Sequence, residues 1–88
     1  MILDIFCEGS HSLKEKRQII SSIKEKLRHK FNISIIESDY HDLWQKIQLA
    51  VALVSDSKVF AEKVFNQVED FVALNYAVQI IHIDKQYL

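Results

Sequence analysis

Apolar residues recur along the chain with two different spacings. Over residues 12–30 and 56–75 they return every third or fourth position, which is the spacing of one face of an α-helix. Elsewhere they come in short runs rich in β-branched and aromatic residues, which is typical of strands. These runs are residues 2–8, 31–38, 45–55 and 76–84. The predicted order along the chain is therefore β-α-β-β-α-β.

This order predicts a single α+β domain over residues 1–88 with a ferredoxin-like fold. Because crossovers between parallel strands are right-handed, both helices should cover one face of a four-stranded antiparallel sheet. The first and third strands should lie in the middle of that sheet. The chain contains no proline and one glycine, so no linker marks a domain boundary.

Side chains in strands alternate between the two faces of a sheet, so the sequence also predicts what each face carries. In the strand over residues 45–55, Ile47, Leu49 and Val51 should face the helices. The opposite face should carry one contiguous apolar patch, and such patches usually mark interfaces. We therefore expect a homo-oligomer that forms through this patch. Its expected members are Phe6, Ile36, Ala50, Ala52, Val54, Ile81 and Ile83.

Charge is distributed unevenly along the chain. The formal net charge is −1, yet residues 11–30 hold seven Lys or Arg against two Glu. Four of these cations share one stripe of the predicted helix: Lys14, Arg17, Lys24 and Arg28. Such a stripe could follow the phosphate backbone of RNA, or it could be a solvated face that balances acidic neighbours. Stacking of RNA bases on the sheet is not expected, because the third strand offers only Ala50 and Ala52.

The start of the same helix reads GSHSLKEKR, in which Ser12 and Glu15 form a capping-box pattern. Ser10, His11 and Ser12 add two hydroxyls and an imidazole to the free N–H groups of the helix start. That combination suits a small anion, so these three residues form a candidate anion site.

Lys16 lies inside the apolar stripe of this helix. A cation there needs either an escape to water or a carboxylate partner. The available carboxylates are Glu37 and Asp39, at the end of the second predicted strand. We predict a structural ion pair between Lys16 and this acidic segment.

The segment ESDYHDLW, residues 37–44, combines three acids with one histidine. Such groups could ligate a metal or transfer protons, but no second histidine or nucleophile accompanies them, which favours a loop-capping role. Trp44 is expected as an anchor, packed on the core or at an interface. The single cysteine, Cys7, excludes an internal disulfide and is expected to be buried.

Catalytic and cofactor-binding motifs are missing, since the sequence has no glycine-rich phosphate loop, nucleophile elbow or HExxH pattern. We expect a binding module rather than an enzyme, with no metal and no cofactor. The longest apolar run, residues 49–54, is too short to cross a membrane, and the first residues do not form a signal peptide. The expected location is the cytoplasm, without membrane contact.

The motifs GSHSLKEKR and KFNISIIESDYHDLWQKIQLAVALVS resemble those of the YlxP-like family, short bacterial proteins that share a domain of unknown function. The resemblance covers nearly the whole chain and is strongest at residues 12–17, 31–32 and 42–45. It implies a ferredoxin-like α+β fold. It also implies a setting, because the family's genes tend to lie among those for translation and ribosome-assembly factors. It brings no catalytic residues that could be carried over.

The residues and the resemblance together support two hypotheses about function. The first is a binding module that contacts RNA or a ribosomal particle through the cationic stripe and self-associates through the sheet. The second is a purely structural or regulatory homo-oligomer, in which the basic helix of one subunit meets the acidic surface of another. A small-anion sensor that uses His11, Lys14 and Lys16 is a further alternative.

Overall fold

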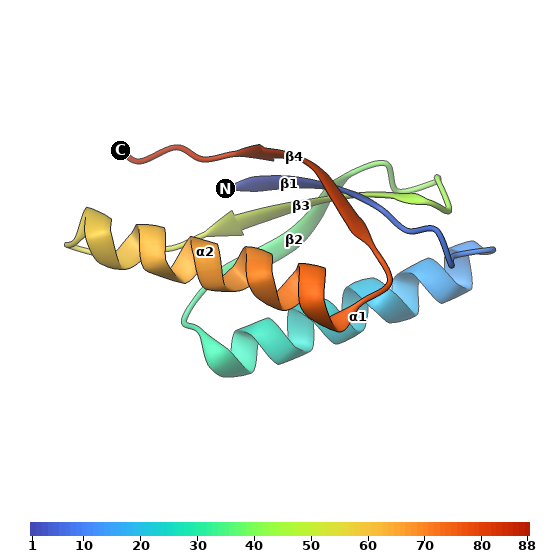
Figure 1. The fold of residues 1–88 in the computed structure, drawn as a ribbon, viewed down its shortest axis with the longest axis horizontal. Coiled ribbons are helices and arrows are strands. Elements are labelled where there is room, and N and C mark those ends of the chain that lie inside the picture. Colours follow the sequence, from blue (N-terminus) through green and yellow to red (C-terminus); the bar gives the residue numbers. More distant parts are fainter.

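Four strands and two helices make up the fold, which a computed structural model describes for all of residues 1–88 (Figure 1). Their order confirms the predicted β-α-β-β-α-β arrangement. The elements are β1 (Ile2–Phe6), α1 (Leu13–Lys30), β2 (Ser34–Asp39), β3 (Lys46–Ala52), α2 (Lys58–Asn75) and β4 (Gln79–Asp84). The apolar runs extend beyond the strands, because Phe31, Ile33 and Leu53 pack against the core from the flanking loops.

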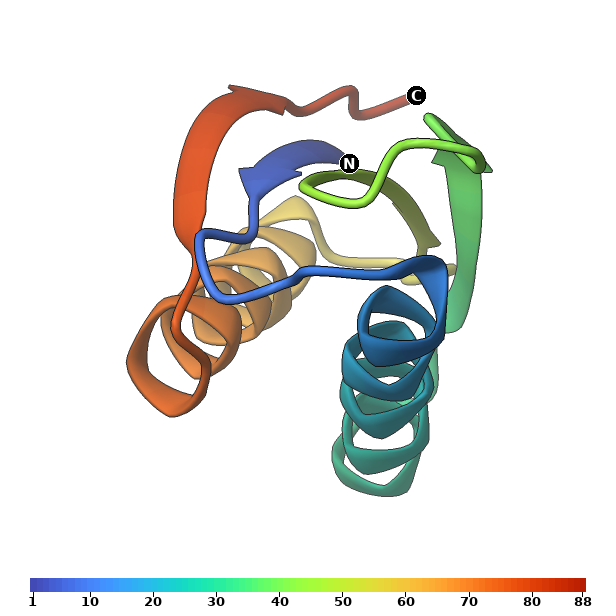
Figure 2. The same cartoon turned by 90° about the vertical axis from the view of Figure 1, so that its right-hand side faces the viewer.

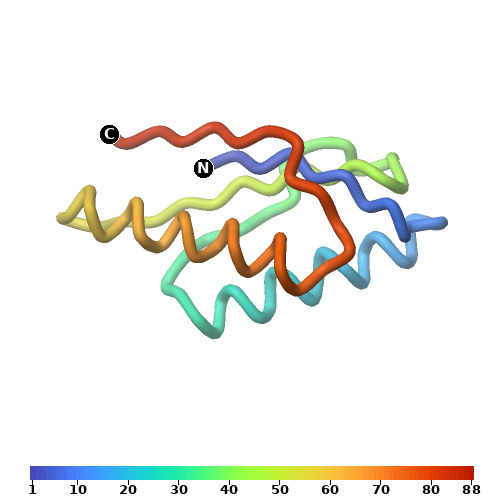
Figure 3. Tube along the Cα trace, in the orientation of Figure 1, coloured from blue at the N-terminus to red at the C-terminus, as the bar shows by residue number.

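The strands form one antiparallel sheet in the order β2-β3-β1-β4, so β1 and β3 lie in the middle as predicted. Figure 2 shows both helices under the same face of this sheet, spaced apart from each other. The opposite face carries no helix. Because Ile2 pairs with Asp84, the two termini lie at the same end of the sheet (Figure 3).

The hydrophobic core fills the space between the sheet and the two helices. On the central strands every second side chain is fully buried, as the alternation predicts: Leu3, Ile5, Ile47 and Leu49. The helices contribute the residues of their inner stripes, Ile20, Ile23, Leu27, Val64, Phe65, Val68 and Val72. Burial of these side chains is the main stabilising contribution to a fold of this size.

A serine hydroxyl caps the N-terminus of each helix. Ser12 Oγ accepts a hydrogen bond from the Glu15 N–H at 3.1 Å, and Ser57 Oγ accepts one from the Phe60 N–H at 3.2 Å. The Glu15 carboxylate accepts from the N–H of His11 at 2.9 Å, one residue before the position that a capping box uses. One of the two acids of α1 is thereby engaged at the helix start.

Two β-bulges decide which residues face the helices. On β4 the pairing with β1 skips Ile81, which is an extra residue in the ladder. Ile83 consequently lies opposite the buried Leu3, on the helix-covered face. The expectation that Ile83 belongs to the outer patch is therefore wrong, because simple alternation does not include the bulge. On β2 the pairing with β3 skips Ser38, and Glu37 lies on the helix-covered face.

Candidate nucleic-acid interface

The four cations of the predicted stripe lie on the side of α1 that faces solvent. Lys14, Arg17 and Arg28 are exposed, and Lys24 is half-buried. Shallow, open depressions run between their side chains. The salt bridges of the chain join other residues, so no carboxylate lies within 4.0 Å of these four charges. The stripe is a cationic surface without an ion pair of its own, and Glu25 is the one acid that lines the depressions beside it.

Two further cations of α1 lean toward the other helix. Lys26 Nζ lies 5.9 Å from the centroid of the Tyr76 ring, and Lys30 Nζ lies 4.7 Å from that of Phe71. The hydroxyl groups of Ser22 and Tyr76 are 2.8 Å apart and share a hydrogen bond. These contacts join α1 to the end of α2 and leave the stripe as the side of α1 that is open to a partner.

Arg28 has a second role at the end of the stripe. Its Nη2 donates a hydrogen bond to the carbonyl of Ile35 at 3.1 Å. Ile35 belongs to β2, an outer strand whose free backbone groups are otherwise open to pairing. Arg28 therefore attaches α1 to the sheet edge, while its other N–H donors remain available.

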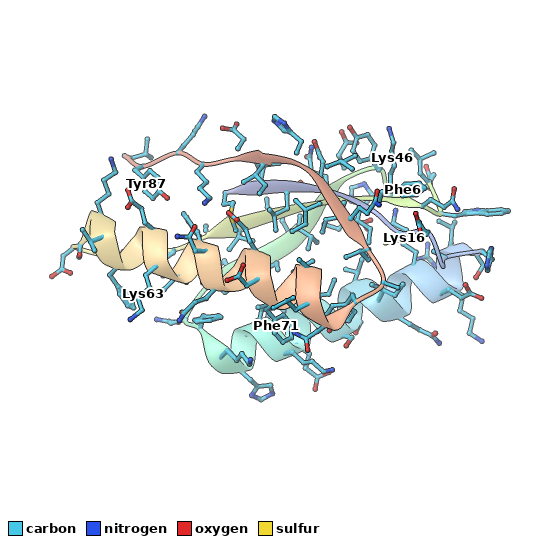
Figure 4. The ribbon with its side chains drawn as sticks, in the orientation of Figure 1. Phe6, Lys16, Lys46, Lys63, Phe71 and Tyr87 are labelled. Atoms are coloured by element: carbon cyan, nitrogen blue, oxygen red, sulfur yellow. The ribbon has the colours of Figure 1, made fainter.

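Lys16 points in the opposite direction, into the edge of the core near the end of the sheet (Figure 4). Its side chain is 1% exposed, and Nζ lies 3.0 Å from Glu37 Oε2. Nζ directs its hydrogen bond at the carbonyl of Tyr40, so the contact with Glu37 is an ion pair without hydrogen-bond alignment. Asp39 is exposed and takes no part, because its Oδ1 accepts from the Tyr40 N–H at 2.7 Å. The structure thus pairs Lys16 with one of its two candidate partners.

The connection between β2 and β3 is held in place by backbone contacts. Tyr40 has a φ of 62°, a left-handed conformation that non-glycine residues rarely adopt, and Lys16 binds its carbonyl. A ring nitrogen of His41, Nε2, lies 3.1 Å from the carbonyl of Glu37. The structure contains no cluster of three His, Cys, Asp or Glu side chains that could hold a metal ion. Residues 37–44 are thus built as a fixed loop.

The candidate anion site at the start of α1 is used internally. Ser10 is buried, and its Oγ donates to the carbonyl of Ser12 at 3.2 Å. The hydroxyl of Ser12 is the helix cap, and only His11 is exposed. Both hydroxyls that were expected to face an anion therefore contact the turn itself.

A row of hydrogen-bonded polar side chains crosses the open face of the sheet. Gln48 Nε2 donates to Asp4 Oδ1 at 2.9 Å, and Ser38 Oγ donates to Gln48 Oε1 at 2.9 Å. By its register, this row separates Phe6 from the apolar positions on the other side, Ile36, Ala50 and Ala52. The expectation of one contiguous patch is therefore wrong. The remaining expected members, Ile81 and Val54, are both exposed, the latter beyond the end of β3.

Comparison with known proteins identifies the family. A family model described as "Protein of unknown function (DUF503)" matches residues 1–85. The chain belongs to the DUF503 family. It is also 43% identical over 61 residues to "Uncharacterized protein YlxP" of Bacillus subtilis (strain 168), and the match covers 69% of this chain and 66% of that relative. The chain thus spans just under two thirds of the length of that relative, and the match confirms the YlxP-like resemblance.

In the structure of the DUF503 chain, two large apolar residues of the connection between β2 and β3 are exposed. Trp44 is 56% exposed and Leu43 is 48% exposed, so packing of Trp44 on the core is excluded. Ile2, which lies opposite Ala50, also belongs to the apolar row of the open face, although it was not among the members of the expected patch. The sequence did contain a sign that Leu43 and Trp44 are exposed, because these large apolar residues stand inside a polar loop. Neither helix of the chain is long and apolar enough to cross a membrane.

Cys7 of the DUF503 chain should resist thiol reagents. Burial raises the pKa of its thiol, and the nearby charge of Lys16 offsets this only in part. Because the thiolate is the reactive form, we expect native protein at about pH 8 to react with a disulfide reagent about 100-fold more slowly than protein unfolded in urea.

The same raised pKa makes stability depend on pH. Above the ordinary thiol pKa of about 8.5, the thiol of Cys7 ionises more readily in the unfolded chain, so the free energy of unfolding should fall as pH rises. A Cys7→Ala variant should lack this contribution and serves as the control. Fast labelling of native protein would show that Cys7 is not protected.

Proposed function

We propose that this protein is a cytoplasmic binding module that contacts the phosphate backbone of structured RNA, free or in a ribosomal particle, through the outward stripe of α1. The observation that carries the proposal is the set of four cations on one open helix face, none of which has a carboxylate partner. Glu25 is the one acid that lines the depressions between these cations, so positive charge is in excess there. Lysine and arginine side chains bind phosphates by displacing condensed counterions.

The dimensions and charge of the molecule suit this role. From Lys14 to Arg28 the helix rises about 21 Å, a length over which a nucleic-acid strand presents several phosphates. Outside residues 11–30 the chain carries four basic and ten acidic residues. The resulting field orients a polyanion toward α1.

Removal of two stripe charges tests the proposal. The double variant Lys14→Ala/Arg17→Ala should bind a structured ribosomal RNA fragment about tenfold more weakly at about 50 mM salt. The slope of log K against log salt concentration should become shallower by about two contacts, because each phosphate contact contributes about one unit. Arg28 is left intact, because its hydrogen bond to Ile35 would mix binding with stability.

The matched control is the double variant Lys58→Ala/Lys63→Ala. It removes the same charge from the first two turns of α2, a helix of equal length, and should change the Kd less than about twofold. Equal losses in both variants would mean that only net charge matters. Failure of the unaltered protein to bind RNA or ribosomal particles at low salt would refute the proposal.

The alternative is a homo-oligomer without nucleic-acid binding. It is supported by the uneven charge of the chain, because residues 11–30 hold seven cations and the rest of the chain holds ten acids. In this alternative the stripe of one subunit meets the acidic surface of another. Sedimentation of the RNA-free protein at low and high salt separates this alternative from the proposed function. Salt should dissociate an oligomer that charge pairs hold together, whereas association through apolar contacts should persist.

A further inference from the structure

A groove at the end of the sheet combines exposed aromatic and apolar side chains with a cation. It is lined by Phe6, Asp42, Leu43, Trp44, Gln45 and Lys46. Figure 4 shows Phe6 and Lys46 at this end, above Lys16. We propose that an unpaired nucleobase of the bound RNA stacks on Trp44 in this groove. This inference rests on the proposed function and adds that the protein prefers RNA with single-stranded nucleotides.

The groove and the start of the cationic stripe lie at the same end of the molecule. Figure 2 shows the start of α1 and the connection between β2 and β3 side by side at this end. Their relative position is fixed, because Lys16 of α1 binds the carbonyl of Tyr40 in that connection. The other end of the connection is also tied, since the N–H of Cys7 donates to the carbonyl of Gln45 at 2.8 Å. A strand that contacts Lys14 and Arg17 at the start of α1 can extend across this end of the molecule to the groove.

The charges around the groove suit a base rather than a phosphate inside it. The carboxylate of Asp42 repels phosphate, whereas a neutral base can enter and meet the indole face. Lys46 also lines the groove, with Nζ 5.4 Å from the centroid of the Tyr40 ring, and its ammonium group can contact a flanking phosphate. Stacking on an exposed aromatic side chain is the usual way in which proteins hold unpaired bases.

A second copy of the chain fits the groove less well. Six residues line it, whereas a stable protein interface uses about 20–30 residues on each side. The polar row of the open face also separates Phe6 from the apolar positions that could extend such an interface. The groove is therefore an isolated apolar spot next to a cationic surface.

The fluorescence of Trp44, the single tryptophan of the chain, reports directly on this contact. The probes are an unstructured RNA strand of about 12 nucleotides and the duplex that it forms with its complement. We expect the single strand to quench the fluorescence and to bind about tenfold more tightly than the duplex. The variant Trp44→Ala should lose this preference, and Trp44→Phe should keep part of it.

The control is Leu74→Ala, which removes an even more exposed apolar side chain from α2 and should retain the preference. If both RNAs bind equally and without quenching, while Lys14→Ala/Arg17→Ala still weakens binding, the stacking site is wrong and the proposed function stands. If neither RNA binds, both fail. A change of oligomeric state in Trp44→Ala would overturn the stacking site in favour of a protein interface.

Discussion

Replacement of Lys16 by methionine is expected to lower the free energy of unfolding by about 3 kcal/mol. The ammonium group is buried, pairs with Glu37 at 3.0 Å and binds the carbonyl of Tyr40. Without it, the Glu37 carboxylate, which is only 18% exposed, is left with no counter-ion. For a domain of this size the loss corresponds to a melting temperature lower by about 12–24 °C. Urea unfolding followed by circular dichroism measures the change.

The double variant Lys16→Met/Glu37→Leu separates the pair from its individual charges. Apolar replacement of both partners removes the unpaired charge as well, so most of the lost stability should return. If the free energy of unfolding of Lys16→Met lies within about 0.5 kcal/mol of that of the unaltered protein, the ion pair does not stabilise the fold. Loss of RNA binding at an unchanged melting temperature would instead assign Lys16 to the binding surface.

Replacement of Leu49 by alanine is expected to cost about 2–5 kcal/mol of the free energy of unfolding. Leu49 is fully buried on β3, at the centre of the sheet, where it lies opposite Leu3. Truncation there removes apolar burial and leaves a cavity between two central strands and the helices, which cannot collapse without moving the sheet. Thermal and urea unfolding both report the loss.

Ile36→Ala is the matched control for this core variant. Ile36 has a similar side chain on the neighbouring strand but is 56% exposed on the open face. Its truncation should change the free energy of unfolding by no more than about 0.5 kcal/mol. Similar costs for the two variants would mean that the open face is covered, as it would be in an oligomer.

The order of elements could be predicted because each element carries a local pattern. The 3.6-residue spacing of Ile20, Ile23 and Leu27 marks α1, and the alternation of Leu3 and Ile5 marks the inner face of β1. The outward stripe of α1 could be predicted for the same reason, since a regular helix fixes which side chains share a side. Its lack of ion pairs could not, because Glu15 and Glu25 lie in the same helix and only the folded chain shows that Glu15 binds the N–H of His11 instead.

The two β-bulges mark the limit of prediction from local pattern. A shift of one residue in a strand moves every later side chain to the other face. At Ile81 such a shift moves Ile83 inward, and at Ser38 a second shift leaves Glu37 rather than Asp39 next to Lys16. Both bulges depend on pairing with a neighbouring strand, which the residues of the bulged strand do not reveal by themselves.

By itself the amino-acid sequence determined the α+β order, the inner faces of the central strands and the cationic stripe, because these follow from periodicities within single elements. Only the tertiary structure decided which acid pairs with Lys16, that the hydroxyls of Ser10 and Ser12 contact their own turn, and that Trp44 is exposed. These outcomes depend on contacts between segments far apart in the chain. Such contacts form only when strand register and the path of the β2–β3 connection are fixed.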